Sequence, residues 1–107
     1  MQEILKSHIK PTAIIAGHDS LAIGAISAIK ENGLRVPEDI AVIGFDDTPE
    51  SLIVAPRLTT VRFPLFDLGK TTVNMLNNLL NKEGKYIREQ QVLPTQLIVR
   101  ESSGVFK

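Results

Sequence analysis

The feature that most constrains the fold is a pair of short apolar runs separated by a helical pattern. The first run covers residues 13–16 (Ala-Ile-Ile-Ala) and the second covers residues 40–45 (Ile-Ala-Val-Ile-Gly-Phe). Continuous apolar runs of this length are typical of parallel strands that are covered on both faces. The residues between them, about 20–32, have the spacing of an amphipathic helix. The sequence therefore predicts an α/β fold, with a parallel sheet and flanking helices.

Capping and turn residues set the predicted ends of the helices. Asp19 or Ser20 is expected to cap the long helix, because a short polar side chain can accept hydrogen bonds from the free backbone N–H groups. Gly33 supplies a left-handed stop at its other end. Thr48 is the expected N-cap of a second, shorter helix over about 49–55, which opens with proline.

The second half of the chain predicts one more strand, a long helix and an extended segment. Residues 58–62 are rich in β-branched side chains, as strands are. A helix is expected between Pro64, which breaks the chain, and Gly84, which ends it. Its apolar positions form one stripe: Leu65, Leu68, Thr72, Leu76 and Leu79, with Val73 and Leu80 beside them. Residues 85–90 are expected to form a loop and residues 91–101 an extended segment, and the last residues are expected to fray.

Composition excludes several classes of protein. The 107 residues suit one small domain, and twelve basic against twelve acidic side chains indicate no nucleic-acid or membrane surface. The chain has no cysteine, which excludes disulfides and thiolate metal sites. No apolar run approaches the roughly 20 residues that a membrane helix needs. Residues 1–6 do not have the pattern of a signal peptide. They are typical of the end of an amphipathic helix, and we expect Met1 to be an artificial start.

Polar side chains follow the two apolar runs directly. His18 and Asp19 come after the first, and Asp46 and Asp47 come after the second. In an open parallel sheet, ligands bind beyond the carboxyl ends of the strands. A carboxylate suits vicinal hydroxyls of a sugar or ribose, and an imidazole can donate or accept a hydrogen bond. For Asp46 a binding role and a plain turn role are equally open, whereas for Asp19 the pattern favours a simple N-cap.

The sequence indicates no enzyme. Its two histidines stand at positions 8 and 18, and it contains no GxSxG, HExxH or glycine-rich phosphate motif. His18, Asp19 and Ser20 are residue types of a catalytic triad, but neighbours in a chain rarely face one another in the required geometry. We therefore expect no catalytic residue, no metal site and no cofactor.

The long predicted helix is apolar on more than one face. One stripe holds Ala22, Ile26 and Ile29. Ile23 projects from another face, and residues 52–54 are apolar as well. A helix of this kind is buried on two sides. Packing within one chain is one explanation, and a subunit interface is the one we favour.

A set of short motifs runs in fixed order from Pro11 to Ser102. The segments are Pro11-Thr12-Ala13-Ile14, His18-Asp19, Ala22-Ile23-Gly24, residues 33–47 (GLRVPEDIAVIGFDD), residues 56–61 (PRLTTV) and residues 93–102 (LPTQLIVRES). Together, in this order and spacing, they resemble the effector-binding core of the lactose/galactose-repressor family.

This resemblance implies a periplasmic-binding-protein-like fold, in which two α/β lobes are hinged around a ligand. In that family the position that matches Asp46 hydrogen-bonds the effector, and the position that matches His18 contacts it too. The stretch that matches Phe63 to Leu65 crosses between the lobes and faces the ligand. The positions that match Ile23, Ile53 and Val54 line the dimer interface.

The resemblance also implies that residues 1–107 are a C-terminal fragment of an effector domain. Residues 11–62 would belong to an incomplete C-terminal lobe, residues 63–92 to the N-terminal lobe, and residues 93–102 to a returning strand. The implied protein is a cytoplasmic, homodimeric repressor that binds a sugar or related small molecule. It would bind operator DNA only through a helix-turn-helix headpiece outside this chain. A periplasmic sugar-binding protein of the same fold is the alternative, and an α/β enzyme is disfavoured.

Overall fold

The computed structural model describes residues 1–81 and 89–104, which fall into two compact units. One unit comprises Met1–Arg62 together with the stretch that begins at Gln96, and the other comprises Phe63–Thr95. The second unit is therefore an insertion into the first in sequence. The chain leaves the first unit after Arg62 and re-enters it at Gln96.

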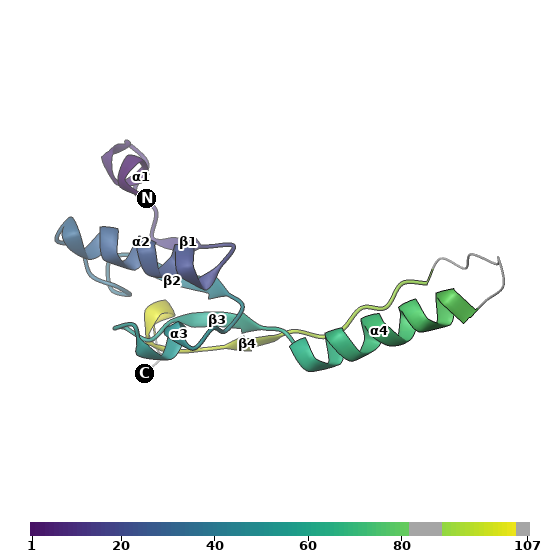
Figure 1. Cartoon of the computed structure of the whole chain (residues 1–107). Coiled ribbons are helices and arrows are strands. Elements are labelled where there is room, and N and C mark those ends of the chain that lie inside the picture. Colours follow the sequence, from purple (N-terminus) through teal and green to yellow (C-terminus); the bar gives the residue numbers. More distant parts are fainter. Residues whose placement is uncertain (82–88, 105–107) are drawn as a thin grey trace. The chain divides into compact units, whose positions relative to one another are not determined.

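The first unit is built on a four-stranded sheet in the order β1-β2-β3-β4 (Figure 1). The strands are β1 (Ala13–Ile15), β2 (Ala41–Phe45), β3 (Thr59–Arg62) and β4 (Gln96–Ile98). β1, β2 and β3 run parallel, and β4 pairs with β3 in the antiparallel direction. The parallel strands confirm the predicted α/β class.

The predicted long helix is α2 (Asp19–Glu31), which packs against β2 (Figure 1). The buried core consists of Ala22, Ile26, Ile29, Val36, Ile40, Val42 and Leu58. Each large aliphatic side chain buried in this way contributes about 1.5–3 kcal/mol. Gly33 follows the helix with φ +74°, so the predicted left-handed stop is confirmed.

Two short helices flank this core. α1 (Gln2–Lys6) confirms a helix at the start of the chain. α3 (Glu50–Ile53) begins one residue later than expected, because its N-cap is Pro49 rather than Thr48. The backbone N–H of Thr48 donates instead to the Asp19 carboxylate at 2.7 Å, which makes Thr48 part of the preceding turn.

The expectation of frayed residues after Glu101 is wrong as far as Gly104. A short 3₁₀ helix, η1 (Glu101–Ser103), follows β4. The hydroxyl of Ser102 is buried, accepts a hydrogen bond from the Thr59 N–H at 2.8 Å and donates to the Val42 carbonyl at 2.6 Å. Because this one side chain bonds to two neighbouring strand segments, it fixes the returning segment on the sheet.

β1 departs from the expectation of a strand covered on both faces. Ile14 is half-buried and packs against the core, whereas Ala13 and Ile15 are exposed. Side chains alternate between the two faces of a strand, and β1 lies at the edge of the sheet. The continuous apolar run therefore has one covered face and one face open to solvent.

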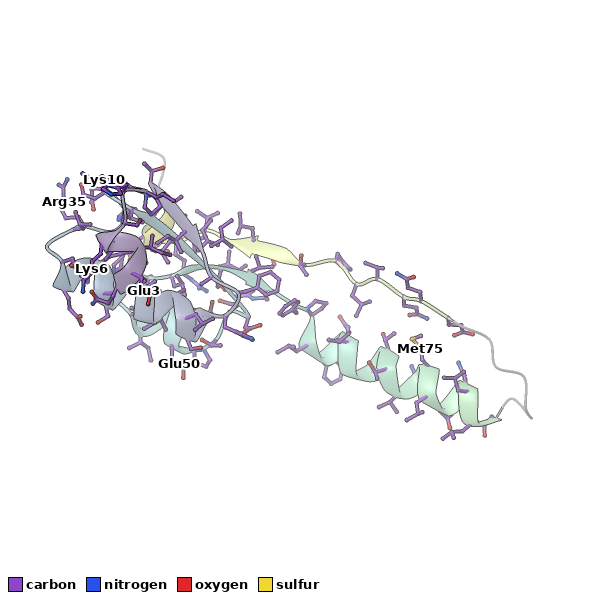
Figure 2. All side chains as sticks on the ribbon, turned by 90° about the horizontal axis from the view of Figure 1, so that it is seen from above. Glu3, Lys6, Lys10, Arg35, Glu50 and Met75 are labelled. Carbon is purple, nitrogen blue, oxygen red and sulfur yellow. The ribbon has the colours of Figure 1, made fainter. Side chains whose placement is uncertain are left out.

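The second unit contains α4 (Leu65–Asn81), which confirms the predicted helix as far as Asn81. Its side chains project along its whole length (Figure 2), and none of its residues is buried. The exposed apolar residues are Leu65, Phe66, Leu68, Val73, Leu76, Leu79 and Leu80. The predicted end at Gly84 and most of the predicted loop at 85–90 lie outside the described residues.

Over residues 1–81 and 89–104, no helix is long and apolar enough to cross a membrane.

We expect the isolated chain to self-associate at micromolar concentration, because both units expose large apolar side chains that water disfavours. Ile53, for example, is 81% exposed. Light scattering should give a mass above that of a monomer. Ile53→Asp should lower the mass, whereas Asn78→Asp, at an exposed polar position of α4, should not. A monodisperse, well-folded monomer would contradict this expectation.

Candidate functional site

The structure brings His18 and Asp46 together at the carboxyl ends of β1 and β2. The Nδ1 atom of His18 lies 2.5 Å from the Oδ2 atom of Asp46. The His18 side chain is 66% exposed and the Asp46 side chain 29% exposed, so both remain open to a ligand. This edge of the sheet therefore offers a carboxylate and an imidazole to the solvent side by side.

Asp46 and Asp47 form a left-handed turn directly after β2. Their φ angles are +113° and +52°, a region that residues other than glycine rarely adopt. Backbone in such sparsely populated regions costs on the order of 1–3 kcal/mol per residue and persists only when the surroundings enforce it. The residues around this turn therefore have to stabilise it.

Asp47 provides one part of that stabilisation. Its Oδ1 atom accepts from Arg100 Nη2, and its Oδ2 atom accepts from Arg62 Nε, each at 2.6 Å. The Asp47 side chain is 8% exposed and that of Arg100 10%. Burial acts to raise the pKa of Asp47, but its hydrogen bonds to Arg100 and Arg62 outweigh this and hold the pKa below its ordinary value.

Arg100 is itself held in place by the first unit. Its Nη1 atom donates to the Leu58 carbonyl at 2.8 Å and to the Ser51 hydroxyl at 2.9 Å. Its backbone N–H donates to Thr59 Oγ1 at 2.8 Å. The guanidinium that pairs with Asp47 is thus held by Leu58, directly before β3, and by Ser51 in α3.

Asp19 also stabilises the turn after β2. The expectation that Asp19 is only an N-cap is wrong. It is the first residue of α2, and its carboxylate is fully buried. The two carboxylate oxygens accept from Thr60 Oγ1 at 2.6 Å and from the Thr48 N–H at 2.7 Å. His18 occupies the N-cap position without a side-chain capping bond. Asp19 therefore links α2 to β3 and to the turn after β2.

Gly44 makes room for the Asp19 carboxylate. A Cβ atom at position 44 would collide with the Asp19 carboxylate oxygen and would lie 2.8 Å from Leu58 Cδ2. The absence of a side chain at this position of β2 is thus a packing requirement of the site.

A shallow hollow adjoins the His18–Asp46 pair. It has a volume of about 410 Å³ and is lined by Ser20, Ile23, Asp46, Thr48 and Glu50. This volume falls in the range of small-molecule sites. The pKa of Glu50 lies below its ordinary value, first because its carboxylate accepts a hydrogen bond from the Glu50 backbone N–H and second because it accepts one from the Thr48 side chain. The hollow therefore has acidic and hydroxyl groups along an apolar wall.

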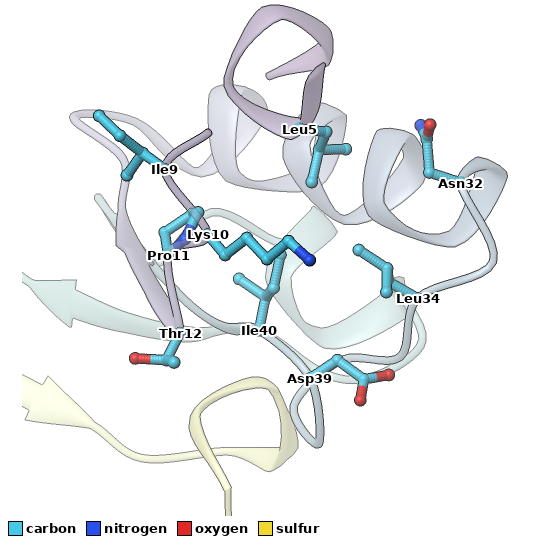
Figure 3. Close-up of a pocket in the computed structure, with 9 residues that line it drawn as sticks. All are labelled: Leu5, Ile9, Lys10, Pro11, Thr12, Asn32, Leu34, Asp39 and Ile40. Carbon is cyan, nitrogen blue, oxygen red and sulfur yellow. The ribbon is translucent and has the colours of Figure 1, made fainter. Parts of the chain in front are cut away.

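A second hollow, of about 380 Å³, lies beside α1 (Figure 3). Its lining is largely apolar, with Leu5, Leu34 and Ile40 around the side chain of Lys10. Its carboxylate, that of Asp39, already accepts hydrogen bonds from the Arg35 side chain at 3.0 and 3.1 Å. Of the two places, the His18–Asp46 edge is therefore the better candidate for a ligand site.

Over residues 1–81 and 89–104, no three His, Cys, Asp or Glu side chains gather in a way that could hold a metal ion.

The model of the periplasmic binding protein-like domain matches residues 1–103. The chain belongs to this family. The Escherichia coli lactose operon repressor is 40% identical over 101 residues, which cover 94% of this chain and 28% of that protein. Another matching relative is the transcriptional repressor PurR of Erwinia tasmaniensis, so the resemblance to the lactose/galactose-repressor group is confirmed.

Two solved structures support the same assignment. The lac repressor dimer bound to operator and the anti-inducer ONPF has a TM-score of 0.84 and 39% identity, over 95% of this chain and 30% of that one. The complex of the transcriptional regulator CelR with cellobiose has a TM-score of 0.87 and 32% identity, over 94% and 31%. The chain thus spans about three tenths of the length of these relatives.

Within this periplasmic binding protein-like chain, the remaining predicted site residues lie in different environments. Phe63 and Leu65 belong to the second unit, where Phe63 is half-buried and Leu65 exposed. In the first unit, Ile23 and Val54 are half-buried against the core, and Ile53 is exposed. Lys30 Nζ donates to the Ala55 carbonyl at 2.5 Å, which ties α2 to the end of α3 beside Ile53 and Val54.

Gly44→Ala should destabilise the fold by about 1–3 kcal/mol, because the added methyl group displaces the buried Asp19 carboxylate. Gly24→Ala is the matched control. It lies within α2 with no atom within 4 Å of the added Cβ, so alanine should stabilise the helix by up to about 1 kcal/mol. Urea unfolding measures both changes. Equal effects of the two substitutions would refute the packing argument.

Acid should weaken the fold through Asp47. The pKa of Asp47 is lower in the folded chain than in the unfolded chain, so the ionised carboxylate stabilises the fold. This stabilisation is complete above the pKa of an unfolded carboxyl group, about 4. It is lost as the pH falls from there toward the lowered pKa of the folded chain. In urea unfolding at a series of pH values, Asp47→Asn should reduce the loss of stability in acid. Asp39→Asn, which removes a more exposed ion pair, should reduce it less. An unchanged acid dependence in Asp47→Asn would contradict this assignment.

Proposed function

We propose that this chain is the effector-binding and dimerisation part of a bacterial transcriptional repressor. The observation that carries the proposal is the exposed His18–Asp46 pair at the carboxyl ends of two parallel strands. Family membership supports it, since the relatives that match the chain are repressors. Those relatives also make the periplasmic sugar-binding protein the weaker alternative.

We propose a polyhydroxy compound, a sugar or a related small molecule, as the effector. An ionised carboxylate accepts hydrogen bonds from two neighbouring hydroxyls, and these charge-assisted bonds are stronger than neutral ones. The imidazole next to it adds a donor or an acceptor. Among the structural relatives, the regulator CelR is in complex with a sugar, cellobiose.

We propose Phe63 and Leu65 as further effector-binding residues of the full-length regulator. In this proposal residues 11–62 are part of the C-terminal lobe, residues 63–92 part of the N-terminal lobe, and residues 93–102 the return. Effector binding would change the relative position of the two lobes in the full-length regulator. Such a change links the effector to a distant DNA-binding site as a coupling free energy between two sites.

We propose that the protein dimerises through Ile23, Ile53 and Val54 and acts in the cytoplasm. Ile53 is exposed beside the half-buried Val54, as an interface residue would be in a separated subunit. The lac repressor dimer on its operator is the structural precedent. Operator DNA would be bound through a headpiece outside these 107 residues.

Asp46→Asn in the full-length regulator should abolish the effector response and leave operator binding intact. Losing the charged acceptor should weaken effector binding by roughly 1.5–3 kcal/mol, which is about ten- to a hundredfold in affinity. A thermal-shift screen of mono- and disaccharides, cellobiose included, first identifies a ligand of the parent protein. Fluorescence titration with that ligand and an operator gel shift then compare the variants.

Asp39→Asn is the matched control, because it makes the same change at an ion pair on a loop that precedes β2. It should leave both measurements unchanged. Normal effector affinity in Asp46→Asn would remove this residue from the site, and loss of operator binding would mean that the variant is misfolded.

A further inference from the structure

We infer that Asp47 is a positioning residue, which holds the Asp46 carboxylate against His18. The inference rests on the proposed function for its significance, since the His18–Asp46 pair is the proposed effector contact. All the contacts that support it lie within the first unit.

The turn at Asp46 is strained and needs an external constraint. Two consecutive residues adopt positive φ, and neither is glycine. Relaxation of Asp46 toward ordinary extended backbone would turn its side chain away from the His18 imidazole. The 2.5 Å contact therefore depends on whatever keeps the turn in its left-handed form.

Hydrogen bonds to β3 and to the returning segment fix this turn. The Asp46 N–H donates to the Val61 carbonyl at 2.9 Å, and the Asp47 N–H donates to Thr60 Oγ1 at 3.2 Å. These backbone bonds would also allow other side-chain directions. The Asp47 carboxylate adds two charged bonds at 2.6 Å, and these fix the plane of the turn against β3 and the returning segment.

The two partners of Asp47 differ in rigidity. Arg100 is 10% exposed and is held by three further hydrogen bonds from its guanidinium and backbone N–H to Leu58, Ser51 and Thr59. Arg62 is 51% exposed and is the last residue before the chain leaves for the second unit. Arg100 is thus the rigid anchor of Asp47, and Arg62 is the partner that can be removed with little change to the core.

The experiment measures the His18 imidazole directly, in the 107-residue chain without effector. The ¹⁵N shifts of an imidazole report which ring nitrogen carries the proton and whether it is hydrogen-bonded. At about pH 8, where an imidazole is ordinarily neutral, the parent should show a proton on Nδ1 bonded to Asp46. In Asp47→Asn the His18 signals should shift toward those of His8, which is exposed and serves as an internal reference.

Two further variants make the result decisive. Asp39→Asn should leave the His18 signals unchanged, because its carboxylate bonds to Arg35. Arg62→Gln should shift them partway, since it removes one of the two charged bonds to Asp47. If Asp47→Asn does not fold, as judged by circular dichroism, Arg62→Gln decides the question.

Parent-like His18 signals in a folded Asp47→Asn or Arg62→Gln chain would overturn the inference, because Asp47 would then stabilise the fold without positioning Asp46. Failure of the proposed function looks different. In that case the His18 signals respond to Asp47 as expected, but Asp46→Asn does not alter the affinity for any sugar.

Discussion

The buried carboxylate of Asp19 is the interaction on which the arrangement of this edge of the sheet depends. A carboxylate removed from water is costly unless its oxygens are hydrogen-bonded, and here both accept short bonds from the chain. Those bonds come from Thr48, in the turn before α3, and from Thr60 in β3, while Asp19 itself begins α2. One side chain therefore sets the start of α2, whose N-cap is His18, relative to the turn that contains Asp46.

A second carboxylate, that of Asp47, acts on the other side of the same turn. The two differ in the chemistry of their partners. Asp19 bonds to two neutral groups, whereas Asp47 pairs with two arginines, the nearly buried Arg100 and the half-exposed Arg62. Between them Asp46 takes a backbone conformation that is unfavourable alone, and its own carboxylate faces His18. In this account the fold maintains strain at one residue in order to present its side chain.

The sequence alone predicts the parts of this structure that depend on local pattern. The apolar runs, the helix between them and the stop at Gly33 follow from spacing and from the backbone freedom of glycine. The role of Asp19 does not follow, because its partners Thr48 and Thr60 lie 29 and 41 positions away and a local rule favours an N-cap. The requirement for glycine at position 44 cannot be predicted from local sequence either, because it arises from the Asp19 carboxylate that packs against it. Ser102 was missed because terminal segments usually fray, and the strands to which it bonds are distant in sequence.

We propose above all that the His18–Asp46 edge of the sheet binds the effector. The most direct measurement is a crystal structure of the full-length regulator with a ligand found by thermal shift. The account predicts a ligand hydroxyl within hydrogen-bonding distance of the Asp46 carboxylate, with His18 in contact with the same molecule. A ligand bound in the protein with both side chains facing only solvent would contradict it.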